Sequence, residues 1–395
     1  MKNLLCCIMV VSILLSFQTV SFAQENTADA REILTVATSP ELEINARSWA
    51  LMDVNTGTLI AGNNENEMLY PASVTKVMSL LLVCEAIENG KLTLDMEITC
   101  SQSAAEKGGS QIWLEAGEVM TVDELLMATV IYSANDACCL LAETVAGSES
   151  AFCQMMNKKA VELNMNNTNF DNCTGLDDDT ETHKTTARDI ALMSCALLKY
   201  DLIRNYTVTW MDTLRNGQTQ LVNTNKIIRT YPGATGLKTG TTSKAGCCVS
   251  ASAERDGLEL VAVVLGADNS KDRFSAAKEL LDFGFANYEI YSPDAKGSYP
   301  ETIRVCHGVK EQVELSHVNF GDVLVNKGVK DQITNEIIIE ESIEAPFEKG
   351  SVVGEIVYKS GETILGSSKI ITAEASDKMT LYKAIVCILK SVKKY

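Results

Sequence analysis

The 395-residue sequence lacks a basic excess, a metal-ligand pattern and a hydrophobic run long enough for a comfortable membrane span. Its formal net charge is −18 at pH 7, which argues against nucleic acid as a partner. None of the thirteen cysteines forms a C-x-x-C pair, and the three histidines show no ligand spacing, so the sequence predicts no metal site. Repeats and low-complexity segments are also missing. The composition is that of an ordinary globular protein, long enough for two domains.

The N-terminal segment 1–23 has the pattern of an export signal. Lys2 supplies a positive charge, Leu4–Phe17 is an apolar core, and Ser21-Phe22-Ala23 is a small-x-small cleavage site. We therefore expect an exported protein whose polar segment 24–40 is a flexible start. A domain of this size does not need disulfides, so we interpret most cysteines as small buried apolar residues.

The C-terminal segment 376–395 predicts an amphipathic helix. Apolar residues cluster on one side of a helical wheel and lysines on the other, namely Leu381, Ile385, Ile388, Leu389 and Val392 against Lys383, Lys390 and Lys394. Such a helix could pack on the protein's own core. The basic face and the terminal position favour an interfacial membrane anchor instead.

The segment between these ends predicts two domains. A hairpin at 48–61 and three strands between 235 and 265 alternate with helical segments over 41–291, which indicates an α+β domain. The segment 292–375 contains short predicted strands separated by Gly and Asn turns, and predicts a small all-β domain.

Three short motifs carry residue types suited to chemistry. Ser73-Val74-Thr75-Lys76 starts an apolar helix, and the i, i+3 spacing brings its hydroxyl and amine within reach of each other. Burial would lower the pKa of that lysine, as a base for serine requires. Ser133-Ala134-Asn135 interrupts two apolar helices, and Lys238-Thr239-Gly240 lies on a predicted strand. Each motif alone fits a helix cap or an exposed lysine.

Together, and in this order, the three motifs resemble those of penicillin-binding proteins and serine β-lactamases. The chain resembles most specifically the low-molecular-weight penicillin-binding proteins, the serine-type D-alanyl-D-alanine carboxypeptidases. The resemblance extends from about Ala46 to Tyr395, and includes the segment His183–Asp189 and Ala345-Pro346-x-x-Lys349-Gly350. It implies a penicillin-binding/β-lactamase-like domain with an antiparallel sheet and a helical cluster, then the β domain and the amphipathic helix.

The resemblance also implies roles for the first two motifs. Ser73 would attack the carbonyl of the penultimate D-alanine of a peptidoglycan stem peptide ending in D-Ala-D-Ala, and Lys76 would take its proton. Ser133 would relay the proton to the leaving D-alanine. Asn135 would hold Lys76 and the substrate amide.

The third motif would bind the substrate. Lys238 and Thr239 would hold the terminal carboxylate, and Gly240 would allow close backbone approach. The backbone N–H groups of Ser73 and Thr241 would form the oxyanion hole. The resemblance implies no metal or organic cofactor, covalent inhibition by β-lactam antibiotics, and a peripheral position on the outer face of the bacterial cytoplasmic membrane.

Three alternatives remain open. A class A β-lactamase would use an E-x-x-x-N carboxylate, and Glu162–Asn166 has that spacing, although we interpret it as chance inside a helix. D,D-endopeptidase cleavage would use the same residues. A non-catalytic penicillin sensor would bind without turnover. We interpret His183 as structural, and we note Lys226 as a candidate second basic group near the carboxylate site. The departures Ala134 and Ala234-Thr235 from the family pattern affect supporting positions only.

Overall fold

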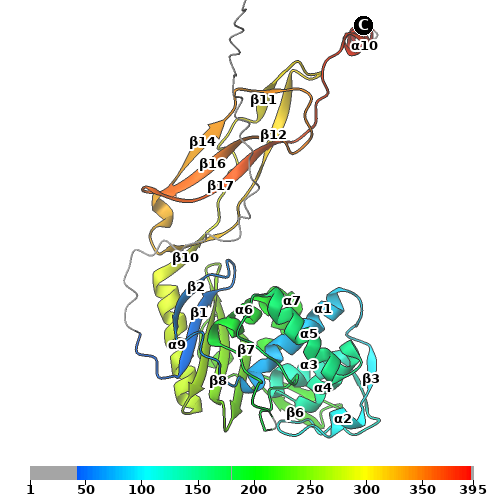
Figure 1. Ribbon diagram of the computed structural model, residues 1–395, viewed down its shortest axis with the longest axis vertical. Helices are drawn as coiled ribbons and strands as arrows, with labels where there is room; N and C mark the ends of the chain where they lie inside the picture. Colours follow the sequence, from blue (N-terminus) through cyan, green and yellow to red (C-terminus); the bar gives the residue numbers. More distant parts are fainter. Residues whose placement is uncertain (1–41, 179, 393–395) are drawn as a thin grey trace, which may run out of the picture. The chain divides into compact units, whose positions relative to one another are not determined.

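The structure, a computed structural model, describes residues 42–178 and 180–392 (Figure 1). Its catalytic part is built on a five-stranded antiparallel sheet of strand order β2-β1-β9-β8-β7. The strands are β1 (Ser48–Asp53), β2 (Leu59–Asn63), β7 (Ala234–Thr242), β8 (Gly246–Arg255) and β9 (Leu258–Ala267). The predicted hairpin and the three predicted strands are therefore present. β7 is an edge strand, which leaves one of its sides available for other contacts.

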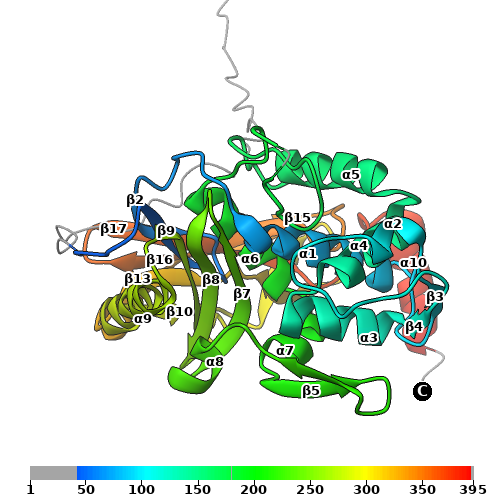
Figure 2. The same ribbon diagram turned by 90° about the horizontal axis from the view of Figure 1, so that it is seen from below.

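Helices cover both faces of this sheet (Figure 2). On one face α9 (Ser270–Asn287) packs against β8 and β9, and on the other lie α1 (Lys76–Glu88) and α6 (Ala187–Leu198). Central strands covered on both faces are apolar throughout, which explains the continuous Val and Leu run of β9. α1 is buried on nearly all sides, as its uniformly apolar sequence predicted.

The remaining helices and two hairpins complete the catalytic part. A capping box of Thr121 and Glu124 starts α3, and a π-helical turn at Ala128–Tyr132 follows it. The helices are α2 (Gln102–Ala105), α3 (Val122–Met127), α4 (Asn135–Ala146), α5 (Glu149–Glu162), α7 (Asp201–Thr207) and α8 (Ile227–Thr230). The hairpins pair β3 (Glu97–Thr99) with β4 (Val119–Thr121), and β5 (Met211–Leu214) with β6 (Thr219–Val222).

The C-terminal part is a six-stranded sheet of order β14-β16-β17-β12-β11-β15. Its strands are β11 (Thr302–Cys306), β12 (Gln312–Val318), β14 (Ile333–Ile339), β15 (Ser342–Glu344), β16 (Val352–Ser360) and β17 (Thr363–Thr372), with a 3-10 turn at Lys330–Gln332. A separate pair joins β10 (Tyr288–Tyr291) to β13 (Val323–Asn326). A small apolar cluster that includes Ile356, Tyr358 and Ile370 forms the core of the sheet.

The last described element is α10 (Leu381–Val392), at the position of the predicted amphipathic helix. Leu381, Tyr382, Ile385 and Leu389 on this helix are exposed. No helix in the described part of the chain is long and apolar enough to cross a bilayer. The predicted leader 1–23 and the flexible segment 24–40 lie outside the described residues.

Candidate active site

The Ser73 motif spans a 3-10 turn and the first residue of α1. The sequence predicted Ser73 on the first turn of an α-helix, but Ala72–Thr75 form a 3-10 turn and α1 begins at Lys76. Because residues i and i+3 eclipse each other in a 3-10 helix, the side chains of Ser73 and Lys76 still meet. The Lys76 Nζ lies 3.0 Å from the Ser73 Oγ. Ala72 has a left-handed φ of +49°, which is unusual for a residue with a Cβ.

The Lys76 side chain is fully buried, yet every proton of its ammonium has an acceptor nearby. Besides Ser73, Nζ contacts the Asn135 Oδ1 at 2.5 Å and the Thr174 carbonyl oxygen at 2.9 Å. Burial lowers the pKa of Lys76 to about 8. Compared with an exposed lysine, the neutral fraction at neutral pH rises by a few hundredfold, on the order of 10^2.5. The structure therefore supplies an amine that can accept a proton.

The second motif holds Lys76 from the opposite side. Ser133 is nearly buried and has a left-handed φ of +67°, which ends the π-helical turn before α4 begins at Asn135. The Asn135 Nδ2 donates to the Gly108 carbonyl oxygen at 2.7 Å, so the amide orientation that offers Oδ1 to Lys76 is fixed. This corner between two helices is rigid, because the Asn135 side-chain amide forms one hydrogen bond through Nδ2 and another through Oδ1.

The third motif lies on β7 beside the Ser73 turn. A Cβ built on Gly240 would lie 2.7 Å from the Ser73 backbone nitrogen, so only glycine lets the strand approach this closely. Lys238 is 2 % exposed and donates to the Thr239 carbonyl oxygen at 2.9 Å. Burial lowers the pKa of Lys238 well below its usual range, and the nearby Lys76 lowers it further. The Thr239 hydroxyl donates to the Thr224 hydroxyl at 2.7 Å.

Arg273 of α9 is a supporting residue that sequence reasoning missed. Its Nη1 donates to the Gly240 carbonyl oxygen at 3.0 Å and to the Thr241 hydroxyl at 3.1 Å. It also donates to the Cys248 carbonyl oxygen at 3.2 Å, and thereby bridges β7 and β8 from the far side of the sheet. An arginine near a helix start gives no sequence signal for this role. Thr224 was missed for the same reason, because only the fold brings it to β7.

His183 supports the nucleophile's turn from behind. Its Nδ1 accepts the Asp171 backbone N–H at 3.0 Å, so the proton sits on Nε2, which donates to the Thr75 hydroxyl at 2.8 Å. Burial lowers the pKa of His183 to about 4, which keeps the ring neutral at ordinary pH. Gly175 also packs here, since a Cβ on it would collide with the Ala72 carbonyl oxygen. The interpretation of His183 as a structural residue agrees with these contacts.

The remaining predicted positions lie in supporting or separate contacts. Lys226 is exposed at the start of α8, whereas its neighbour Thr224 reaches the third motif. Glu162 is the last residue of α5, is half exposed and pairs with Lys159 at 2.7 Å. Ala134 is fully buried. Thr235 donates to the buried Glu259 carboxylate at 3.0 Å, so an acidic group does lie beside this strand, but it comes from β9.

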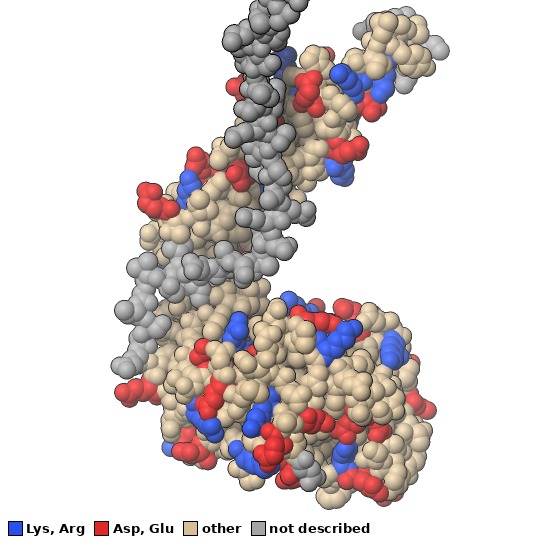
Figure 3. Space-filling model, in the orientation of Figure 1, with Lys and Arg blue, Asp and Glu red and all other residues tan. Residues whose placement is uncertain are grey.

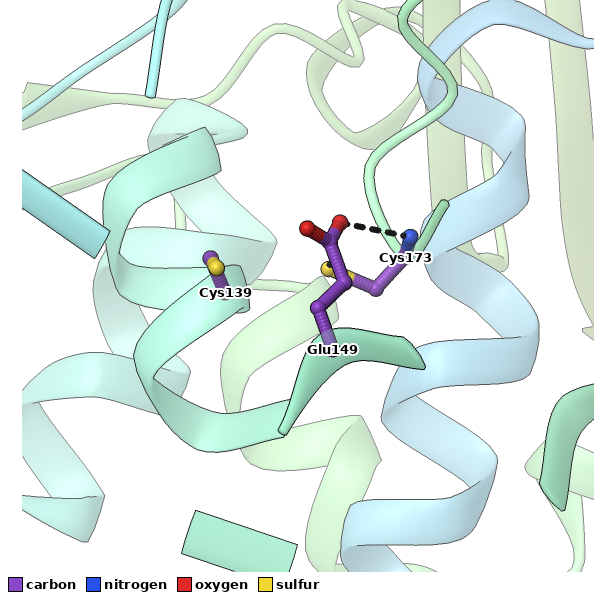
Figure 4. A group of neighbouring side chains, drawn as sticks. All are labelled: Cys139, Glu149 and Cys173. Carbon is purple, nitrogen blue, oxygen red and sulfur yellow. Dashed lines mark hydrogen bonds between the residues drawn. The ribbon is translucent and has the colours of Figure 1, made fainter. Parts of the chain in front are cut away.

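A group of cysteines lies beneath the loop that holds Lys76. The Cys139 and Cys173 thiols and the Glu149 carboxylate lie within 4.8 Å of one another, a grouping that could hold a metal ion (Figure 4). The Glu149 carboxylate already accepts from the Cys173 N–H and thiol, both at 3.2 Å, and pairs with Lys107. These contacts account for the group as a hydrogen-bonded support of the loop. The ten cysteines whose side chains the structure describes are free thiols.

The chain matches a known family over most of its length. The family model of D-alanyl-D-alanine carboxypeptidases matches residues 34–269. The chain belongs to the D-alanyl-D-alanine carboxypeptidase family. A second model, the C-terminal domain of penicillin-binding protein 5, matches residues 287–378. These matches confirm the predicted family, the serine-type carboxypeptidase class and the α+β fold with its C-terminal β domain.

Relatives of this family cover nearly the whole chain. The D-alanyl-D-alanine carboxypeptidase DacF of Bacillus subtilis is 38% identical, over 96% of this chain and 95% of its own. DacC of Escherichia coli is 33% identical over 88% and 86%. Penicillin-binding protein 5 of Haemophilus influenzae superposes with a TM-score of 0.74 at 28% identity, covering 87% of this chain and 100% of its own.

One structural neighbour holds a β-lactam. Penicillin-binding protein D2 of Listeria monocytogenes was solved in an ampicillin-bound form. It superposes with a TM-score of 0.57 at 29% identity, over 62% of this chain and 100% of its own. Within this carboxypeptidase family, the catalytic part of the present chain therefore resembles a domain that accepts such a compound.

Proposed function

We propose that this protein removes the terminal D-alanine from peptidoglycan stem peptides through an acyl-enzyme on Ser73. One observation carries the proposal: the Ser73 hydroxyl lies 3.0 Å from the amine of a fully buried lysine with a pKa of about 8. A hydroxyl is a weak nucleophile until a neighbouring base takes its proton. Lys76 is placed and tuned for that task.

In the acylation step, the Ser73 Oγ bonds to the carbonyl carbon of the penultimate D-alanine while its proton passes to the Lys76 Nζ. The C–N bond to the terminal D-alanine then breaks, and the proton reaches the leaving amine by way of the Ser133 hydroxyl. The backbone N–H groups of Ser73 and Thr241 stabilise the oxyanion. Water then hydrolyses the ester and returns a proton to the Ser73 Oγ.

The carboxylate of the substrate adjusts the charges of the two lysines. Without the substrate, the buried amines of Lys76 and Lys238 repel each other when both are charged. Burial and Lys76 therefore lower the pKa of Lys238. A carboxylate bound by Lys238 and Thr239 favours the charged form of Lys238. The charge on Lys238 then disfavours a proton on Lys76. In this way substrate binding itself prepares the base, with Asn135 holding the amine and the substrate amide and Gly240 leaving room for the strand to approach.

Two measurements test this function. Mass spectrometry of a penicillin-labelled tryptic digest should find the acyl group on Ser73, and release of D-alanine from diacetyl-Lys-D-Ala-D-Ala should follow steady-state kinetics. Stable acylation without D-alanine release would support the penicillin sensor instead. Rapid turnover of penicillin without lasting acylation would support a β-lactamase, although Glu162 is engaged with Lys159. A cross-linked muropeptide dimer in place of the pentapeptide measures D,D-endopeptidase cleavage.

We further propose the predicted organisation: catalytic domain 41–291, β domain 292–375 and membrane-anchor helix 376–395. The exposed apolar residues Leu381, Ile385 and Leu389 of α10 support an interfacial anchor on the outer face of the cytoplasmic membrane. Elsewhere, the surface visible in Figure 3 carries acidic and basic side chains side by side. The anchor's basic residues would therefore provide the local attraction to anionic lipid.

Sedimentation with anionic vesicles tests the anchor. The full chain should bind, and Ile385→Glu should release it while penicillin acylation stays unchanged. Val318→Glu, an exposed apolar position of the β domain, is the matched control and should still bind. Equal binding by the Ile385 variant would contradict the anchor.

A further inference from the structure

Trp113 differs from the other two tryptophans of the chain. Its side chain is 76 % exposed, whereas Trp49 is buried and Trp210 lies 5.0 Å from the Arg229 guanidinium. Trp113 also has a left-handed φ of +58°, which is rare and costly for a bulky residue. Strained residues of this kind persist where the surroundings enforce them, and they cluster at ligand sites. Neither the exposure nor the strain contributes to the hydrophobic core.

Hydrogen bonds on both sides of Trp113 fix the loop that exposes it. The backbone N–H groups of Ile112 and Leu114, on either side of it, donate to the buried Asp136 carboxylate at 3.1 Å. Arg215 donates to the Ile112 carbonyl oxygen at 2.8 Å and is itself fixed by Glu118. The tryptophan therefore projects from a loop that is tied on both sides.

The same loop borders the candidate active site. The Asn135 N–H donates to the Ser110 carbonyl oxygen at 2.7 Å, and the Asn135 side chain donates to Gly108 while accepting from Lys76. Asn135 and Asp136 are consecutive residues of the second motif, so one corner of the chain fixes both the catalytic lysine and the loop that presents Trp113. The loop that carries Trp113 is therefore joined to the candidate active site through Asn135 and Asp136.

We propose that Trp113 is a platform on which a sugar ring of the peptidoglycan strand stacks during catalysis. The proposal rests on the function proposed above, because the stem peptide is attached to that sugar. An aromatic ring offers an electron-rich face to the C–H bonds of a pyranose. Ser110, exposed, and Gln111, half buried, add neutral hydrogen-bonding groups nearby. The charged Arg215 and Glu118 beside the loop pair with each other, and a single ring with neutral polar neighbours suits an N-acetylated sugar better than a wide apolar partner.

The kinetic test compares two substrates that differ in the sugar. For a disaccharide pentapeptide, Trp113→Ala should raise KM about tenfold with little change in kcat, as the loss of one aromatic contact implies. For diacetyl-Lys-D-Ala-D-Ala, KM should stay the same. Trp113→Phe should restore most of the difference. An equal loss on both substrates, or no loss on the disaccharide substrate, would overturn the platform.

A binding test works without catalysis. The disaccharide N-acetylglucosaminyl-N-acetylmuramic acid should quench tryptophan fluorescence of the full chain, and the quenching should vanish in Trp113→Phe but remain in Trp210→Phe. If Trp113→Ala fails to fold, Trp113→Asn replaces it, because asparagine tolerates the left-handed backbone. Quenching that persists without Trp113 would contradict the proposal. Quenching by the sugar together with no D-alanine release from either substrate would instead contradict the proposed function alone.

Discussion

The catalytic part and the β domain bury different kinds of side chain. In the described part of the chain, the catalytic part buries Lys76, Lys238 and Asp136, whereas the buried polar residues of the β domain are the hydroxyl residues Ser368 and Thr372. Burying a charge costs free energy unless partners compensate it. The buried charges of the catalytic part therefore lower its stability at the candidate active site. The β domain has no such buried charges among its described residues and has the composition of a structural support.

The largest expected difference between the two parts comes from removing the nucleophile of the catalytic part. Ser73→Ala should lower the rate of D-alanine release at least about a thousandfold, since no other hydroxyl can form the ester. The melting temperature should change little, because Ser73 is only half buried. Penicillin labelling and D-alanine release measure the loss. Ser368→Ala removes a buried β-domain hydroxyl and serves as the control with full activity. Residual penicillin labelling in Ser73→Ala would place the acyl group elsewhere.

A cavity in the β domain should lower stability without affecting catalysis. Ile356 is fully buried in its apolar cluster, so Ile356→Ala should lower the free energy of unfolding of that domain by about 3 kcal/mol. Penicillin acylation should stay at the wild-type rate. Denaturant titration followed separately by activity and by circular dichroism measures both. A parallel fall in acylation would mean that the two parts are not independent.

His183 should make the stability of the catalytic part depend on pH, with an effect similar in size to that of the β-domain cavity. Burial lowers its pKa in the folded chain to about 4 from an ordinary 6.5. Between these values the unfolded chain binds the proton and the folded chain does not, so stability falls as pH drops from 6.5 to 4. The loss is roughly 3 kcal/mol. Denaturant titrations at several pH values should show this slope in wild type and in the control His317→Gln, but not in His183→Gln. An unchanged slope in His183→Gln would assign it to other groups.

The smallest expected effect, about tenfold for each pH unit, concerns the acylation rate below pH 8. Burial lowers the pKa of Lys76 to about 8, and only the neutral amine accepts the serine proton. The second-order rate constant of penicillin acylation, which reports the free enzyme, should therefore rise with pH and level off above 8, where the amine is mostly neutral. Stopped-flow acylation measures this profile, and Ile356→Ala should share it. A rate that is flat between pH 6 and 8 would rule out Lys76 as the base.

The sequence predicted those parts of the site that depend on local spacing. Ser73 and Lys76 meet because they are three residues apart, and β7, β8 and β9 follow from short runs rich in Val, Thr and Leu with turn residues between them. The 3-10 turn at Ala72–Thr75 was not predictable, because β7 and Gly175 pack against it from elsewhere in the chain.

Supporting residues that come from distant parts of the sequence were not predicted, for the same reason. Arg273 and Thr224 reach the site through the fold, and their neighbours in sequence give no signal of it. In the β domain, β12 and the three-residue β15 carry little local signal in the sequence. β12 is mostly polar and half exposed, and β15 pairs in parallel with β11, so both depend on partners that come from distant sequence.

The three oxygen neighbours of Lys76 have a consequence for how the resting enzyme stores its reactivity. As an ammonium, Lys76 donates one proton each to Ser73, Asn135 and Thr174. As a neutral amine it keeps two donors for the amide and carbonyl oxygens, while its lone pair receives the serine hydrogen. Both ionic forms thus fit one arrangement of atoms. The change from idle to armed enzyme needs only the loss of one proton from Lys76 and a turn of the Ser73 hydroxyl hydrogen toward the amine 3.0 Å away, and no side chain has to swing.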